Sequence, residues 1–386
     1  MDVTPYLKLM VDREASDLFF YVGAPVNIKI EGTVMPLGNV PLKPGAVREI
    51  AYSLMTDSQI REFERDLESN FALSVSEIGR FRANVFRQRG EVSMVIRYIK
   101  QRIPDFVELS LPQILGNLVM EKRGLVLMVG ATGSGKSTTL TSMIDYRNEH
   151  ISGHILTLED PLEFLFKNKK SIVNQREVGT DTKAFQTALK NALRQAPDVI
   201  FIGEIRDKDT MTQAIAYAQS GHLCLATLHA NNSYHAMSRI ISFYPLDNRP
   251  ALLADLAVTL KCVISQRLVK TPSGGRVAAV EVLMNSRYIA ELIEKGELNE
   301  IKEALENSMV PGSQTFEQAL YQLYRTNTIT LDEALANADS ANNLQQVINN
   351  AKAEAEGKPA GDDAAQNPTK SVAPGSFSEF KLNMDA

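Results

Sequence analysis

The stretch Gly130-Ala-Thr-Gly-Ser-Gly-Lys-Ser137 has the spacing GxxxxGK[ST], follows the apolar run LVLMV and precedes a predicted helix. Backbone N–H groups of such a loop, and of the helix behind it, present partial positive charge to phosphate groups. The motif therefore predicts a nucleotide phosphate site. Lys136 would reach the β and γ phosphates, and the Ser137 hydroxyl would bind Mg²⁺. The residues expected to bind the nucleotide are Gly130, Ala131, Thr132, Gly133, Ser134, Gly135, Lys136, Ser137 and Thr138.

Nucleotide hydrolysis also needs a second ligand for the metal and a carboxylate that orients water. The run PDVIFIGEIRD places Glu204 after an apolar strand at 199–202, at the carboxyl end where open α/β sheets bind ligands. The run ILTLEDPLEF ends another strand with Glu159 and Asp160, and Glu163 follows after a proline. Three carboxylates this close are compatible with plain surface charge. Beside a phosphate loop, ATP and Mg²⁺ give a reason to cluster groups that otherwise repel, so both are predicted cofactors.

Two of the five histidines, His222 and His229, flank the predicted strand 223–228 in GHLCLATLHANN. A zinc site requires three or four nitrogen or sulfur ligands, and these two lack partners at suitable spacing. As polar groups at the end of a sheet strand, they are candidates for sensing the γ-phosphate or the catalytic water. A single histidine is more often structural, so this interpretation depends on the neighbouring strand ends.

The elements around these residues predict an α/β protein. From residue 124, apolar runs alternate with helical stretches, which is typical of a parallel sheet covered on both faces. The preceding residues predict a small α+β domain, and the Ala-, Gly-, Pro- and acid-rich end of the chain predicts disorder. The expected parts are an N-terminal domain 1–100, a linker 101–112, an ATPase domain 113–284, a helical part 285–350 and a disordered tail 351–386.

Alternation in the N-terminal strands places arginines together on one side of the sheet. In 81–86 the apolar residues occupy alternate positions, which leaves Arg82 on the polar side, and Arg97 points outward from 92–98. A solvated face and a ligand-binding face are equally compatible with this pattern.

Composition limits the class of protein further. The net charge of −5 argues against a chain whose main task is to bind nucleic acid. The two cysteines stand far apart without a CxxC pair, which excludes a zinc ribbon and fits a reducing compartment. The N-terminus has no apolar signal core, and no apolar run approaches the roughly 18 residues of a membrane span. We expect a cytoplasmic protein without direct membrane insertion.

The phosphate loop, LEDPLEF, IFIGEIRD and GHLCLATLHANN, in this order and spacing, resemble the Walker A, Asp-box, Walker B and His-box segments of the secretion ATPases that drive type IV pili and type II secretion. The resemblance covers about residues 5–345. ASDLFFYVGAPVNIKIEG is similar to the family's ASDLH start, and GRFRANVFRQRG to its interface strand. The short chain without a tetracysteine motif is most similar to the pilus-retraction branch, the PilT/PilU-type ATPases.

One segment departs from the PilT pattern. At 288–295, where PilT-type proteins carry AIRNLIRE, the two arginines are replaced by Ala290 and Glu294. Together with the extended C-terminal tail, this change favours the PilU group within the branch.

The resemblance implies a PAS-like N-terminal domain, a RecA-like P-loop domain and specific roles for the site residues. Glu163 is implied to orient water, Glu204 to support Mg²⁺ coordination, and His222 and His229 to couple nucleotide state to conformation. Family members are ring hexamers with ATP at the cleft between domains and neighbours, which gives the polar-face arginines, Arg82 and Arg97, a role in contacting phosphate when the N-terminal domain closes. The implied partners are further copies in a homohexamer, a PilT-type retraction ATPase and an inner-membrane pilus platform protein, with the ring peripheral at the base of the pilus.

Three functions are therefore compared. The first is a hexameric motor that hydrolyses ATP and promotes type IV pilus retraction. The second is an ATP-binding accessory ring that acts only with a PilT-type motor, which the altered 288–295 stretch motivates. The third, a secretion or DNA-translocating RecA-like ATPase, is disfavoured for DNA by the acidic balance of charge.

Overall fold

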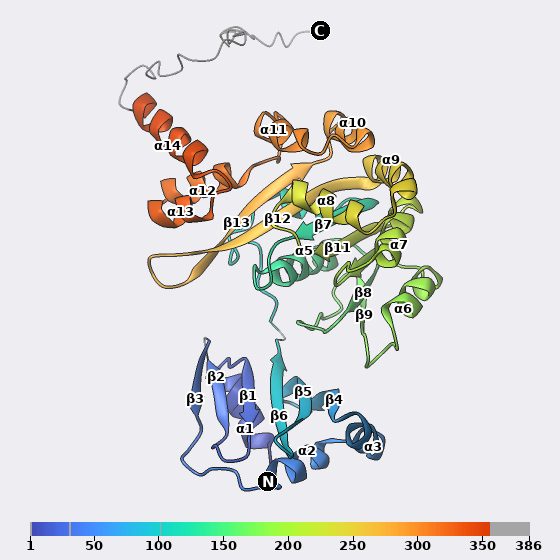
Figure 1. Cartoon of the computed structure of the whole chain (residues 1–386), viewed down its shortest axis with the longest axis vertical. Coiled ribbons are helices and arrows are strands. Elements are labelled where there is room, and N and C mark those ends of the chain that lie inside the picture. The colour runs from blue at the N-terminus through green and yellow to red at the C-terminus, as the bar shows by residue number, and fades with distance from the viewer. Residues whose placement is uncertain (1, 31, 101, 356–386) are drawn as a thin grey trace.

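The N-terminal part of the chain is an antiparallel sheet with helices on one face. The computed structural model describes residues 2–30, 32–100 and 102–355 (Figure 1). The first sheet has the strand order β3-β2-β1-β6-β5-β4. Its strands are β1 (Asp17–Phe20), β2 (Asn27–Ile30), β3 (Thr33–Pro36), β4 (Glu68–Val75), β5 (Gly79–Gln88) and β6 (Glu91–Ile99). Its helices are α1 (Thr4–Asp12), α2 (Ala46–Leu54) and α3 (Asp57–Asp66).

Alternation in β5 divides this sheet into a buried and a polar face, as the sequence predicts. Phe81, Ala83 and Val85 are fully buried against the helices, whereas Arg80 and Arg82 alternate with them and remain partly exposed. The small α+β domain is therefore confirmed, and its arginines lie on the face away from its own core.

The second sheet is mostly parallel. Its strand order is β13-β12-β7-β11-β10-β8-β9, and β13 alone runs antiparallel, paired with β12. The sequence predicted a parallel sheet and did not anticipate this antiparallel edge. The strands are β7 (Gly124–Val129), β8 (His154–Glu159), β9 (Ile172–Glu177), β10 (Val199–Ile202), β11 (Leu223–Leu228), β12 (Leu260–Lys270) and β13 (Arg276–Met284).

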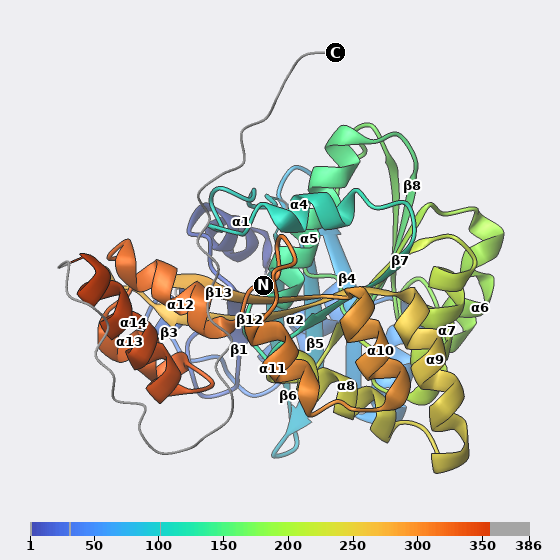
Figure 2. The same cartoon turned by 90° about the horizontal axis from the view of Figure 1, so that it is seen from above.

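Helices cover both faces of this sheet (Figure 2). In β7, Leu125 and Leu127 pack into one core and Val126 and Met128 into the other, because successive side chains of a strand point to opposite faces. This two-sided burial explains why the strand is apolar throughout. One face is covered by α4 (Ile114–Val119) and α5 (Lys136–His150); the other by α6 (Phe185–Ala192), α7 (Lys208–Gln219), α8 (Ser233–Ser242), α9 (Arg249–Thr259) and α10 (Arg287–Lys295).

The remaining helices follow α10; the first of them, α11, packs in the same core as α10, and the later ones pack on the long ends of β12 and β13 (Figure 1). They are α11 (Glu300–Glu306), α12 (Phe316–Arg325), α13 (Leu331–Asn337) and α14 (Ala341–Ala355). Because α14 continues to Ala355, it passes the expected tail boundary at 351; the rest of the expected disordered tail lies outside the described residues. Within residues 2–30, 32–100 and 102–355, none of the helices is long and apolar enough to cross a membrane.

Candidate functional site

The glycine-rich loop joins β7 to α5 at the carboxyl edge of the second sheet. Gly130 and Gly135 have φ of 154° and 85°. A Cβ at Gly130 would lie 2.6 Å from the backbone oxygen of Gln266, and one at Gly135 would lie 2.7 Å from the Gln266 Nε2 atom. Both positions therefore require glycine. Because Gly135 is the N-cap of α5 and has no side chain, the first-turn N–H groups of the helix are left for an anion.

Lys136 is the cation of the loop. Only 8% of it is exposed, and its ammonium donates hydrogen bonds to the backbone oxygens of Gly130, at 2.8 Å, and Ala131, at 2.9 Å. Burial lowers the pKa of Lys136, while the nearby charges of Glu204 and Glu163 oppose that shift. In the described part of the chain no carboxylate lies within ion-pair distance of this ammonium. A buried cation held only by carbonyls fits a site that receives phosphate.

The ends of β10 and β11 bring Glu204 and His229 together beside this loop. One Glu204 oxygen lies 3.1 Å from His229 Nε2, and the other accepts a hydrogen bond from Arg206 Nε at 2.7 Å. Arg206 also lies 3.6 Å from Asp160, at the end of the neighbouring β8. Polar side chains from three strand ends thus form one charged group at the same edge.

His222 lies at the amino ends of the parallel strands, opposite the ends that carry the phosphate loop. It precedes β11, and its backbone oxygen accepts from the N–H of Gly124, the first residue of β7. Because β11 and β7 are parallel, a strand of six residues separates this edge from the phosphate loop, roughly 20 Å. Its Nδ1 atom contacts the Ser220 hydroxyl at 3.0 Å. The expectation that both histidines sense phosphate is therefore corrected: within one chain only His229 lies at the loop.

Glu163 and the N-terminal arginines face a common cleft. The cleft, of about 580 Å³, is lined by Thr138 and Glu163 from the ATPase part and by Arg82 and Arg97 from the polar face of the first sheet. The Leu165 N–H also donates to the Lys100 oxygen at 3.2 Å, which links the chain leaving β6 to the segment that carries Glu163.

Each cleft arginine already has a carboxylate beside it. Arg97 Nε donates to Asp17 at 2.8 Å. Arg82 lies 4.0 Å from Glu177, at the end of β9, and Arg80 lies 3.7 Å from the other oxygen of the same carboxylate. Burial raises the pKa of Glu177, against the lowering effect of the two arginines.

The three carboxylates of LEDPLE have different surroundings. Glu163 and Asp160 are exposed, whereas Glu159 is 6% exposed and accepts hydrogen bonds from Thr157 Oγ1, at 2.7 Å, and Gln175 Nε2, at 3.4 Å. Burial raises the pKa of Glu159 from 4.5 to about 7, and those hydrogen bonds only partly offset the effect. Glu163 alone of the three lines the cleft.

Gln266, on β12, is a contact of the loop that the motifs did not reveal. It is 2% exposed and lies between Ser134 and Thr139, with hydrogen bonds of 2.8 Å to each. The only sequence signal is a group of three polar residues, Ser265, Gln266 and Arg267, inside the otherwise apolar run CVISQRLV. Such a group in a buried strand indicates specific polar contacts.

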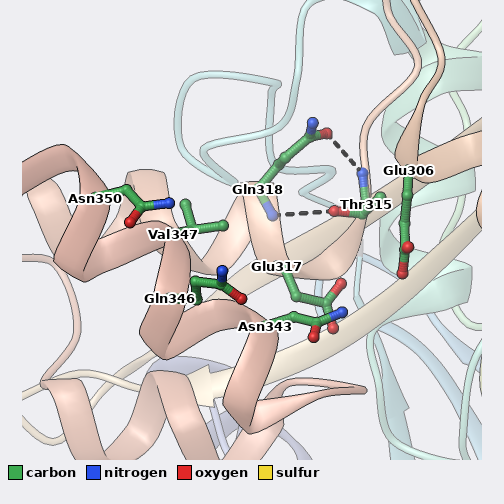
Figure 3. Close-up of a pocket in the computed structure, with 8 residues that line it drawn as sticks. All are labelled: Glu306, Thr315, Glu317, Gln318, Asn343, Gln346, Val347 and Asn350. Atoms are coloured by element: carbon green, nitrogen blue, oxygen red, sulfur yellow. Dashed lines mark hydrogen bonds between the residues drawn. The ribbon is translucent and has the colours of Figure 1, made fainter. Parts of the chain in front are cut away.

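A second hollow lies among the C-terminal helices (Figure 3). It measures about 340 Å³, and Thr315 and Gln318 beside it form the capping box of α12. Its described lining contains carboxylates and amides but neither lysine nor arginine: Glu306, Thr315, Glu317, Gln318, Asn343, Gln346, Val347 and Asn350. A phosphate would meet acidic groups there, so the loop at Lys136 is the better nucleotide site.

Comparison with known proteins agrees with this geometry. The type II/IV secretion system protein family matches residues 2–319. The chain is 51% identical to the type IV pilus ATPase PilU of Pseudomonas aeruginosa, covering 90% of this chain and 91% of PilU. It is 37% identical to the pilus retraction ATPase PilT of the same organism, covering 89% of this chain and all of PilT. The crystal structure of the pilus retraction motor PilT with bound ADP superposes with a TM-score of 0.84 at 41% identity, over 90% of this chain and 99% of that one.

The matches to PilU and to the PilT crystal structure span 90% or more of each chain. The residues that the family model matches, 2–319, include both sheets and the glycine-rich loop. The chain therefore belongs to the type II/IV secretion system protein family, as a PilU-like ATPase related to the PilT retraction motor.

Proposed function

We propose that this protein is a homohexameric motor that hydrolyses ATP and uses domain movement to promote retraction of a type IV pilus. The likeness to PilU and PilT supports the pilus as its setting. The observation that carries the proposal is the shared cleft, in which Glu163 and Thr138 of the ATPase part face Arg82 and Arg97 of the N-terminal domain. A site built from two domains changes its chemistry when those domains move.

The loop has the features that a nucleotide phosphate requires. Gly130 and Gly135 have no side chains to cover the backbone of the loop. The Ser134 hydroxyl is buried without a hydrogen-bond partner among the described residues, and Lys136 supplies positive charge. In the proposal the residues from Gly130 to Thr138 bind the phosphates. Mg²⁺ commonly takes one or two protein ligands and completes its shell with phosphate oxygens and water, and Ser137 and Glu204 would be those ligands.

Glu163 is the proposed catalytic carboxylate. It is exposed to the cleft, and it would hold water by accepting its hydrogen bonds. Arg82 and Arg97 would contribute positive charge when the N-terminal domain closes. In other P-loop enzymes a supplied arginine changes turnover by about 10³–10⁵-fold, so a small domain rotation is enough to gate hydrolysis.

A ring gives each site a second face, since a head-to-tail interface that closes places a neighbour at every cleft. In this arrangement His229, which contacts Glu204, couples the metal ligand to the segment after β11. His222, at the far edge of the same strand, would couple through β11 or through the neighbouring subunit. We place the ring on the cytoplasmic side, peripheral to the inner membrane, where a pilus platform protein would receive its movement.

The test is steady-state ATP hydrolysis by the purified, full-length protein after its assembly state has been measured. Glu163→Gln should keep nucleotide affinity and lose most turnover, because an amide cannot act as the anionic acceptor for water. Glu297→Gln, an exposed glutamate on the C-terminal helical part, is the matched control and should turn over like the parent. Turnover by Glu163→Gln equal to that of the control would exclude the proposed role.

A second function, an accessory ring that acts only with a PilT-type motor, is favoured by α10. The helix exposes Glu294 and half-buries Ala290, where the PilT pattern has arginines, and the chain is more similar to PilU than to PilT. Hydrolysis should then require the added PilT-type partner. Pilus retraction restored in cells that lack the partner motor would contradict the accessory function.

A further inference from the structure

We propose that Gln266 is a positioning residue of the phosphate loop: its side-chain amide orients the peptide between Ser134 and Gly135 so that the loop is formed before the nucleotide arrives. This inference rests on the proposed nucleotide site and adds a residue from a distant strand to it. Gln266 lies 130 residues beyond Lys136 in the chain.

The register of the sheet brings Gln266 to the loop. β12 runs parallel to β7, with Ser265 opposite Val129, so the next residues of the two strands, Gln266 and Gly130, meet where the loop begins. The Gln266 backbone oxygen would lie 2.6 Å from a Cβ at Gly130. The strand therefore contacts both ends of the loop, through its backbone at Gly130 and through its side chain at Gly135.

Both ends of the Gln266 amide are used. Nε2 donates to the Ser134 backbone oxygen at 2.8 Å, and Oε1 accepts from the Thr139 hydroxyl at 2.8 Å. The reversed amide would set its oxygen against a carbonyl oxygen, so the contacts fix the orientation. The side chain is 2% exposed, and water does not compete for these bonds.

Holding this carbonyl also directs an N–H group. Among the described peptides only the Asp160–Pro161 bond is cis, so the peptide between Ser134 and Gly135 is trans. In a trans peptide the C=O and the following N–H point in opposite directions. With the Ser134 oxygen held toward the Gln266 amide, the Gly135 N–H points away from that amide, and in the proposal this N–H is left for a phosphate. The oxygens of Gly130 and Ala131 are held separately by Lys136.

Lys136 and Gln266 hold different parts of the loop, and we expect them to respond differently when nucleotide binds. Lys136 is the group expected to turn toward the phosphates, and its hydrogen bonds to the loop would then weaken. The Gln266 bonds involve no group that the nucleotide needs, so they remain to hold the loop in shape. A loop formed in advance binds with less loss of conformational entropy, which raises affinity.

The test compares dissociation constants for ADP and ATP, with magnesium present, in the full-length protein far below its melting temperature. Gln266→Glu keeps the shape but replaces the donor with an acceptor that repels the Ser134 oxygen. Gln266→Met removes both bonds with similar volume. Each should weaken nucleotide binding about ten-fold, because a lost or unsatisfied buried hydrogen bond is commonly worth one order of magnitude in an equilibrium constant.

Gln314 offers a matched control. Its Nε2 donates to the Val280 oxygen at 2.7 Å, which is likewise a hydrogen bond from a glutamine amide to a backbone carbonyl, but away from the loop. Gln314→Glu and Gln314→Met should lower the melting temperature and leave the dissociation constants unchanged. If the Gln266 variants also lower only the melting temperature, the residue is structural and the inference is overturned.

Two further variants distinguish failure of the nucleotide site from failure of the role proposed for Gln266. Lys136→Ala should abolish nucleotide binding; failure of the parent protein itself to bind would refute the nucleotide site rather than the role of Gln266. If neither Gln266 variant folds, Thr139→Val frees the other end of the same amide. Faster amide hydrogen exchange across 130–135 with weaker binding would support the inference, and unchanged exchange and affinity would overturn it.

Discussion

Replacing Glu159 with glutamine should stabilise the protein at high pH and not at low pH. The carboxyl group is 6% exposed at the end of β8, and burial raises its pKa from 4.5 to about 7. Ionising it inside the fold therefore costs free energy that the unfolded chain does not pay. Glutamine has nearly the same shape, still accepts the hydrogen bonds from Thr157 and Gln175, and never ionises.

The magnitude follows from the pKa difference. One pKa unit corresponds to about 1.4 kcal/mol, so a rise from 4.5 to about 7 lowers the free energy of unfolding by about 3 kcal/mol once the group is ionised in both states. Because the pKa of Glu159 is higher in the folded state than in the unfolded chain, its contribution to the free energy of unfolding is fully present below pH 4.5. That contribution is lost as the pH rises to 7. Glu159→Gln removes this loss.

The assay is thermal unfolding of parent and variant at pH 5, 6, 7 and 8. Between pH 5 and pH 8 about 2.5 kcal/mol of this loss occurs, so at about 2–4 °C per kcal/mol for a unit of this size the variant should gain about 5 °C or more relative to the parent. Any cost of the new amide hydrogens is the same at every pH and cancels in this comparison. Glu297→Gln, an exposed glutamate, should show no such trend. A difference between Glu159→Gln and the parent that stays constant from pH 5 to pH 8 would refute the reasoning.

Three other predictions test neighbouring parts of the fold. Gly135→Ala should weaken ADP binding at least about ten-fold in calorimetric titration, since its φ is 85° and its Cβ would lie 2.7 Å from Gln266; unchanged affinity would contradict a close fit there. Arg267→Met should lower the free energy of unfolding by about 3 kcal/mol and speed hydrogen exchange in 331–351, because Arg267 pairs with Asp339 and lies 3.9 Å over the Phe316 ring. Equal exchange in the variant and the parent would contradict that anchoring role. Burial raises the pKa of both thiols, so neither cysteine should react with a disulfide reagent at pH 8 until urea unfolds the chain, and rapid labelling of the native protein would show the burial to be wrong.

Much of the architecture could be predicted from local pattern. The all-apolar run of β7 requires helices on two faces, and the alternation of β5 requires one buried face, so both sheets follow from short stretches of sequence. The glycine loop is equally local, because its chemistry is contained in one motif. The strand direction of β13 is not local: it depends on a turn and on pairing along β12, and its residues give no sign of which way the strand runs.

The site depends more on contacts between distant segments. The carboxylates of LEDPLE look alike in sequence, and only the fold shows that Glu159 is buried against Gln175 while Glu163 faces the cleft. Gln266 likewise carries no motif, and its importance appears only through the register of β12 beside β7. His222 is different, because its position could have been deduced. The residue that precedes a strand and the residue that follows it lie at opposite ends of that strand. One of the two histidines that flank β11 must therefore lie far from the loop.

The pairing of Arg82 with Glu177 bears directly on how the proposed motor would close. The distances of 4.0 Å from Arg82 and 3.7 Å from Arg80 to this carboxylate are at the outer limit of ion pairs, and both arginine side chains remain about one quarter exposed. Burial also raises the pKa of Glu177, which weakens it as an anionic partner. A nucleotide phosphate carries more charge and accepts more hydrogen bonds than this carboxylate, so exchanging one partner for the other would cost little. In the proposed motor, the ion pairs between the N-terminal domain and Glu177 are thus weak enough for a nucleotide to replace, and that is the requirement for a cleft whose closure depends on what occupies it.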